Sequence, residues 1–71
     1  MSDKAEFVHL EAAIFGAESQ IQRQREFIAN LRTNGAPIDD AERTLEVMIG
    51  ILVRLQRYRA VIKHLSKPAI H

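Results

Sequence analysis

The side chains of this chain that are best suited to hold a metal are its histidines. A fold at Gly35 would bring His9 and His64 to similar heights, where they could offer nitrogen ligands to zinc. Glu6 or Glu11 could add an oxygen ligand. A zinc site needs three or four converging ligands, and two level histidines at the open end of a hairpin fall short of that. We therefore expect surface histidines, with zinc as the minor alternative.

A second group that could carry chemistry consists of Arg23, Gln24, Arg25 and Arg54. Helical bundles can build ligand and active sites from side chains on facing helices. No nucleophile–base pair accompanies this group, and the serines lie outside any nucleophile-elbow context. Gln24 and Arg59 each interrupt an otherwise apolar row, where a polar residue more often sets register or reaches out at the edge than catalyses. We expect no enzymatic activity and no cofactor.

Length and composition indicate one small domain that needs help to bury its surface. The chain has 71 residues, no cysteine, 46% hydrophobic residues and a net charge of +1. A chain of this size hides only about 60% of its unfolded surface, and disulfides, a metal or a partner subunit usually supply the missing stability. Because cysteine is absent, association with another subunit is the expected solution.

The same features predict a soluble, cytoplasmic protein. The start of the chain lacks the apolar stretch of a signal peptide. The longest apolar run, Val47 to Val53, is far shorter than the roughly 20 residues that span a bilayer. The absence of cysteine fits a reducing compartment. We therefore expect no membrane association.

Hydrophobic periodicity predicts an all-α fold, two helices folded back on each other as an antiparallel hairpin. Apolar residues recur at spacings of three and four in two rows, which places each row on one side of a helix. Asn34-Gly35-Ala36-Pro37 separates the rows, because glycine can close a helix and proline cannot continue one. The predicted segments are a helix over 3–33, a turn over 34–38, a helix over 39–66 and a tail over 67–71. The two seams are Phe7, Leu10, Ile14, Ala17, Ile21, Ile28 and Leu31, and then Leu45, Met48, Leu52, Leu55 and Ile62.

The distribution of charge supports the antiparallel arrangement. Each predicted helix is acidic at its start and basic at its end, as the helix macrodipole prefers. Folding at Gly35 places each acidic half beside the basic half of the other helix. Exposed ion pairs contribute only about 0–1 kcal/mol each, so they select the topology rather than hold it together. The two candidate pairs are Glu18 with Arg54 and Arg25 with Glu46.

The helices carry more apolar surface than two seams use. The first has a second row at Ala5, Val8, Ala12 and Phe15, and the second adds Val47, Ile51, Tyr58, Val61 and Leu65. A helix that is apolar all round belongs in an interior, and the chain has no third helix to provide one. We therefore expect a homodimer in which two hairpins close into a four-helix bundle. The expected partner or dimer interface is Val8, Phe15, Val47, Met48, Ile51, Leu52, Leu55 and Tyr58.

Two further partners can be weighed against self-association. A partner helix could fill the same apolar groove, with Phe15 and Tyr58 as anchors. Nucleic acid is disfavoured, because the basic residues are spread around the second helix and the glycines and aromatics of RNA modules are missing. The expected function is a non-enzymatic protein–protein interaction module, a small regulator that binds a partner through an apolar helical face. The alternative is a self-assembling structural subunit without a regulatory partner.

Three segments of the chain form a pattern that occurs elsewhere. They are Gln22-Arg23-Gln24-Arg25-Glu26-Phe27-Ile28-Ala29-Asn30-Leu31, Ala41-Glu42-Arg43-Thr44-Leu45-Glu46 and Arg57-Tyr58-Arg59. This part of the chain resembles a group of short bacterial helical-hairpin proteins of unassigned function, in which an RQRE…I…L segment, a polar corner and an AE..L…L helix recur. The resemblance covers about 40 residues, from Ile21 to Ile62. It implies a helical hairpin in a bacterial cytoplasm and brings no catalytic residues.

Overall fold

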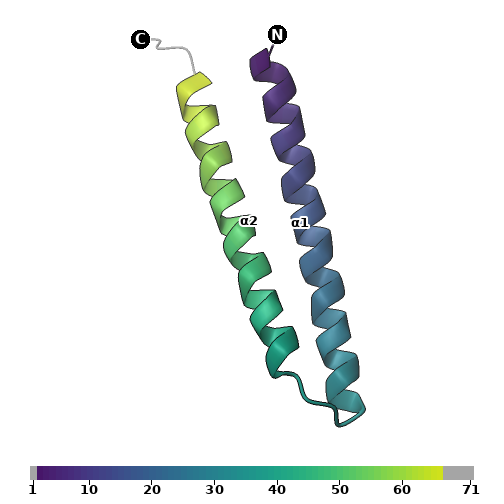
Figure 1. The fold of residues 1–71 in the computed structure, drawn as a ribbon. Helices are drawn as coiled ribbons and strands as arrows, with labels where there is room; N and C mark the ends of the chain where they lie inside the picture. The colour runs from purple at the N-terminus through teal and green to yellow at the C-terminus, as the bar shows by residue number, and fades with distance from the viewer. Residues whose placement is uncertain (1, 67–71) are drawn as a thin grey trace.

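Two long helices make up the fold of this chain. The computed structural model describes residues 2–66, with α1 at Ser2–Thr33 and α2 at Asp39–Ser66. The helices pack side by side in opposite directions, so the start of α1 and the end of α2 lie at the same end of the molecule (Figure 1). The molecule is a rod of 58 × 19 × 15 Å. The expected all-helical hairpin is confirmed, while the expected tail at 67–71 lies outside the described residues.

The corner between the helices is closed by its own backbone. The Ala36 N–H donates to the Leu31 carbonyl at 2.9 Å, and the Gly35 N–H donates to the Arg32 carbonyl at 3.0 Å. These two bonds form a Schellman motif, in which the residue after the helix adopts a left-handed conformation. Gly35 does so, with φ of 71°, which costs glycine little because it has no Cβ. α1 therefore ends just before Gly35, where the left-handed conformation of the glycine lets the chain turn back.

The start of α2 is also fixed by a backbone bond. The Glu42 N–H donates to the Ile38 carbonyl at 2.8 Å, which makes Ile38 the residue that caps the helix. Asp39, Asp40 and Glu42 then occupy its first turn. Negative charge there is stabilised by the partial positive charge of the helix N-terminus. The acidic residues thus favour a helix that begins directly after the corner.

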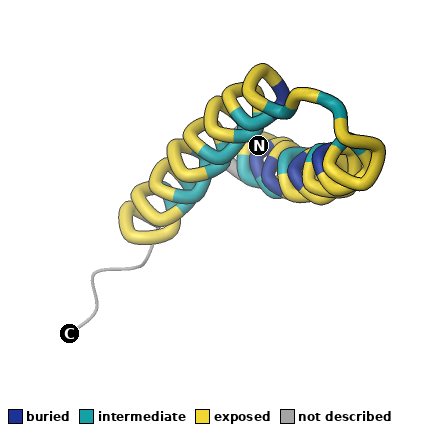
Figure 2. Tube along the Cα trace, turned by 90° about the horizontal axis from the view of Figure 1, so that it is seen from below, coloured by how far each residue is buried: buried dark blue, intermediate teal, exposed yellow. Residues whose placement is uncertain are grey.

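The core is a single line of contact along the two helices. Four residues of the predicted α1 seam are buried, and Ile14 is the most enclosed, with 2% of its surface exposed. The seam residues of α2 are half-buried. Figure 2 shows the buried positions following α1 and the intermediate ones following α2. The buried residues are Leu10, Ile14, Ile21, Ile28 and, at the start of α2, Ala41.

Candidate interaction surface

Two polar residues that interrupt the seams set the register of the helices. The Gln24 side-chain amide donates to the Ala41 carbonyl at 2.9 Å across the interface. Near the open end, Arg59 Nη1 lies 3.1 Å from Glu11 Oε1. Arg59 therefore leaves the seam at its edge, with 30% of its side chain exposed, and meets a carboxylate there. Both residues have structural partners, as their positions in apolar rows suggested.

The ion pairs between the helices follow the predicted charge pattern but join other residues. Glu11 pairs with Arg59 near the open end, and Arg32 pairs with Glu42 at 3.0 Å near the corner. In each case an acidic half contacts the basic half of the opposite helix. The expected pairs, Glu18 with Arg54 and Arg25 with Glu46, are not formed among the residues that the structure describes.

The reason is the direction in which the side chains leave the helices. Arg54 follows the seam residue Leu52 by two positions, a rotation of about 200°. Its side chain therefore leaves α2 away from α1, although the residue stands level with Glu18. Glu46, which follows Leu45 by one position, is likewise exposed. The prediction of these two pairs was wrong because equal height along a hairpin does not by itself produce contact.

The candidate chemical groups of the sequence do not converge. His9 and His64 are both exposed, and within the described residues no three histidine, aspartate, glutamate or cysteine side chains are grouped to hold a metal ion. Arg23 and Arg25 are exposed on α1, while Gln24 between them is engaged by the backbone of α2.

A row of mostly apolar, exposed side chains lies on α2. Its members alternate at spacings of four and three and all stand outside the seam. The exposed fractions of the flanking residues Val47 and Leu65 are 63% and 76%. We call this row the outer stripe, and it consists of Val47, Ile51, Arg54, Tyr58, Val61 and Leu65.

A shorter apolar row lies on α1. Phe15 is 72% exposed and Val8 is also exposed. These residues stand four after and three before Glu11, so they share the side of α1 from which Glu11 reaches Arg59. We call this the N-terminal row, and it consists of Ala5, Val8, Ala12 and Phe15.

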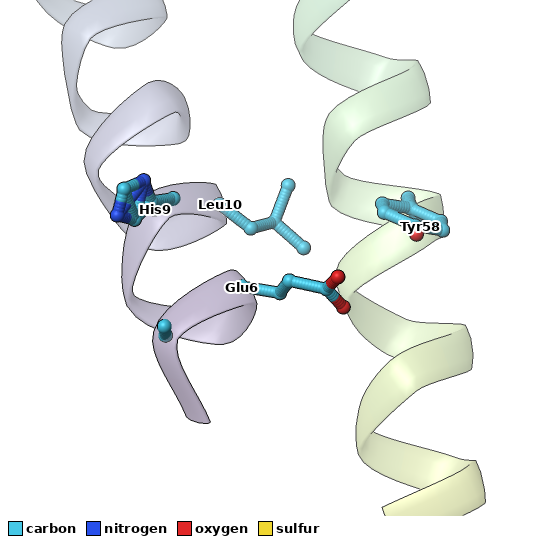
Figure 3. A pocket seen from close by; sticks show the side chains of 5 residues that line it. Glu6, His9, Leu10 and Tyr58 are labelled. Atoms are coloured by element: carbon cyan, nitrogen blue, oxygen red, sulfur yellow. The ribbon is translucent and has the colours of Figure 1, made fainter. Parts of the chain in front are cut away.

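The outer stripe and the N-terminal row face different sides of the hairpin. Tyr58 borders a shallow hollow near the open end, shown in Figure 3, whose lining residues are Ala5, Glu6, His9, Leu10 and Tyr58. Glu6 and Glu11 are five residues apart, so their side chains leave α1 about 140° apart. Phe15 lies on the side of Glu11 and Tyr58 on the side of Glu6. Of the row, only Ala5 reaches the edge of the Tyr58 hollow.

The residues predicted for an interface therefore fall into three places. Val47, Ile51 and Tyr58 are in the outer stripe, and Val8 and Phe15 are in the N-terminal row. The remaining three, Met48, Leu52 and Leu55, are half-buried in the seam of α2, the helix that packs against α1. The set did not include Phe27, whose surface is exposed beside the seam residue Ile28. The sequence indicated this exposure, because Phe27 is a large aromatic residue one position before a seam residue and therefore leaves the helix away from the seam.

A second hollow interrupts the surface of α2 within the outer stripe. It is lined by Glu46, Val47, Gly50, Ile51 and Arg54. A Cβ atom added at Gly50 would meet nothing within 4 Å, so the space above this glycine is open. Val47, Gly50, Ile51 and Arg54 follow one another at intervals of three, one and three residues. This is the set of four positions that forms a hole for a side chain of a facing helix.

The described part of the chain contains no helix with the length and apolarity required to cross a membrane. Similarity to known proteins adds nothing to the geometry: the chain matches no family model, no curated protein and no solved structure.

Proposed function

We propose that this chain is a non-enzymatic protein–protein interaction module that acts as a homodimer, two hairpins closing into a four-helix bundle. The observation that supports this most strongly is the outer stripe. Five large apolar side chains lie in one row on α2 and remain outside the hairpin core. Burying each of them fully would contribute roughly 1.5–3 kcal/mol, which exceeds the contribution of the surface ion pairs.

The geometry of the stripe suits a bundle. The stripe is centred about 100° around α2 from the seam, estimated from 100° of rotation per residue. A helix at the corner of a square bundle contacts two neighbours in directions roughly a right angle apart. One direction on α2 faces α1, and the second is the outer stripe. A second hairpin that covered it would complete the environment that α2 lacks.

The N-terminal row favours a regulator over a purely structural subunit. This row lies on a different side of the hairpin from the outer stripe, so a dimer formed through the stripe leaves Val8 and Phe15 exposed. An exposed aromatic anchor in an apolar row suits a partner protein that offers a groove. We place this regulator in the cytoplasm, where a protein without cysteine needs no oxidising conditions. The alternative is a self-assembling subunit in which further copies cover the N-terminal row.

Light scattering after size exclusion tests the proposal with the wild-type chain and two variants. We expect the wild-type chain to have twice its chain mass at micromolar concentration, and Ile51→Glu to be monomeric and helical. Ala60→Glu is the matched control, because Ala60 is exposed on the opposite side of α2. A wild-type monomer at this concentration would refute the dimer.

Phe15→Glu separates the regulator from the self-assembling subunit. If the Phe15→Glu variant still has the mass of a dimer, the N-terminal row lies outside the dimer interface and is available to a different protein. If the assembly formed by the Phe15→Glu variant has a lower molar mass than that of the wild type, the row lies inside the assembly, which would support the self-assembling subunit.

A further inference from the structure

The spacing of the outer stripe is the same when it is read in either direction. From Val47 to Leu65 the steps are four, three, four, three and four residues. A helix with such a row can pair with a second copy of itself about a two-fold axis, because each facing pair then occurs twice. The facing pairs would be Val47 with Leu65, Ile51 with Val61, and Arg54 with Tyr58 of the second copy.

The one charged residue of the stripe selects this antiparallel arrangement. A parallel pairing in register would place Arg54 against Arg54 of the second copy, with like charges at the centre of an apolar row. The antiparallel pairing instead places each guanidinium against the ring of Tyr58 of the second copy. A guanidinium over a tyrosine face is attracted by the negative face of the ring. Antiparallel helices also bring opposite ends of the helix macrodipoles together.

The hollow at Gly50 fits the same register. The hole formed by Val47, Gly50, Ile51 and Arg54 is centred near residues 50 and 51. In the antiparallel register these positions face Val61 and Ile62 of the second copy, and Val61 is the exposed member of the two. The hollow is open because glycine contributes no side chain. In this register the hollow therefore faces Val61 of the second copy and has room for its side chain.

We infer that two copies of this chain associate through α2 against α2, antiparallel, with Arg54 of each copy on Tyr58 of the other and Val61 of each in the hollow over Gly50 of the other. This pairing rests on the proposed homodimer and specifies which helices meet and in which direction. It makes the two α2 helices the contact between the hairpins and leaves the N-terminal rows of the two copies on the outside.

Disulfide trapping tests the direction, because the chain has no cysteine of its own. We expect an equimolar mixture of Ile51→Cys and Val61→Cys chains to form a mixed disulfide dimer under mild oxidation. Each variant alone should stay reduced, since residue 51 of one copy lies about 15 Å along the axis from residue 51 of the other, beyond disulfide reach. Cross-linking of Ile51→Cys with itself would overturn the antiparallel register.

An exchange of the central residues tests the Arg54–Tyr58 contact. Arg54→Tyr chains place tyrosine against tyrosine, and Tyr58→Arg chains place arginine against arginine. We expect Tyr58→Arg chains alone, which bring four guanidinium groups to the two central contacts, to associate at least tenfold more weakly than the wild type. A mixture of the two should recover wild-type affinity, because both contacts then join arginine to tyrosine. Both substitutions are at exposed positions, so helical circular dichroism should remain unchanged.

The outcomes separate this pairing from the proposed function. If the wild-type chain is dimeric but neither the mixed disulfide nor the mixed-variant recovery is found, the α2–α2 pairing is overturned while the interaction module stands. If the wild-type chain is monomeric at micromolar concentration, both are overturned.

Discussion

The α1 seam and the outer stripe of α2 have the same residue pattern in opposite environments. Both are rows of mostly apolar side chains at alternating spacings of three and four residues, and each contains one polar position, Gln24 in the seam and Arg54 in the stripe. Ile14 in the seam is 2% exposed, whereas Ile51 in the stripe is 47% exposed. Periodicity therefore determines which side chains share a face of a helix, and the number of helices available determines which faces are covered.

The sharpest test of this difference makes the same substitution in both rows. Ile14→Ala should lower the free energy of unfolding by about 2–5 kcal/mol, because it leaves a cavity in the core. Ile51→Ala should change the free energy of unfolding of the isolated subunit by about 0.5 kcal/mol or less, because the side chain is exposed there. Urea unfolding followed by circular dichroism, at a concentration too low for dimers, measures both. Equal losses would mean that the stripe is already buried in one subunit and would end the comparison.

The two glycines within the helices have different surroundings. Gly16 on α1 and Gly50 on α2 both have free space where a Cβ would stand, but only Gly50 lies in the hollow of the outer stripe. Gly50→Leu should weaken self-association about tenfold or more, equivalent to ~1.4 kcal/mol, because leucine fills the hole. Gly16→Leu should leave it unchanged. Sedimentation analysis measures the affinity of self-association. If Gly50→Leu and Gly16→Leu change this affinity equally, the hollow does not lie in the interface.

The corner and the helices should respond with opposite signs to one chemical change. Gly35→Ala should lower the free energy of unfolding by about 1–2 kcal/mol, because alanine is strained at φ of 71°. Gly16→Ala should raise it by up to about 1 kcal/mol, since alanine is the better helix former. Both positions have room for the methyl group, so crowding cannot explain the difference. Thermal unfolding of the two variants side by side measures it.

The smallest effect concerns the ion pair at the open end. Glu11→Gln should lower the free energy of unfolding by about 0.5 kcal/mol in low salt and by less in high salt, because the pair is partly exposed and is screened. Glu18→Gln is the control, since Glu18 is exposed and forms no ion pair in the described part of the chain. A loss for Glu11→Gln that is independent of salt would contradict an electrostatic contribution.

Local signals were enough to predict the fold. Gly35 and Pro37 mark the corner, and the two apolar rows mark the faces that meet, so the hairpin and its two helices follow from neighbouring residues. The helix bounds differ from the expected ones by one residue, at the start of α1. Each of these features depends on interactions within a few positions of the chain.

The contacts between the helices could not be predicted in the same way. Glu11 pairs with Arg59 and the expected pairs are not formed, because the direction of a side chain decides contact as much as its position along the hairpin. The acceptor of Gln24 is a backbone carbonyl, which has no sequence signature. The expectation that Phe15 and Tyr58 both stand outside the core is consistent with their exposure, but their separation onto two sides required the position of Glu11.

The backbone-closed corner has a consequence for how the chain reaches its structure. Its hydrogen bonds join residues within five positions of one another, so this turn can form before any distant pair has met. We expect the helices to lengthen away from the turn at about nanoseconds per residue, and to make their contacts first near Ile28 and last near Leu10. Folding should be fast, as for other proteins built from local contacts. Amide protons should exchange with solvent earliest at the end farthest from Gly35, where closure comes last.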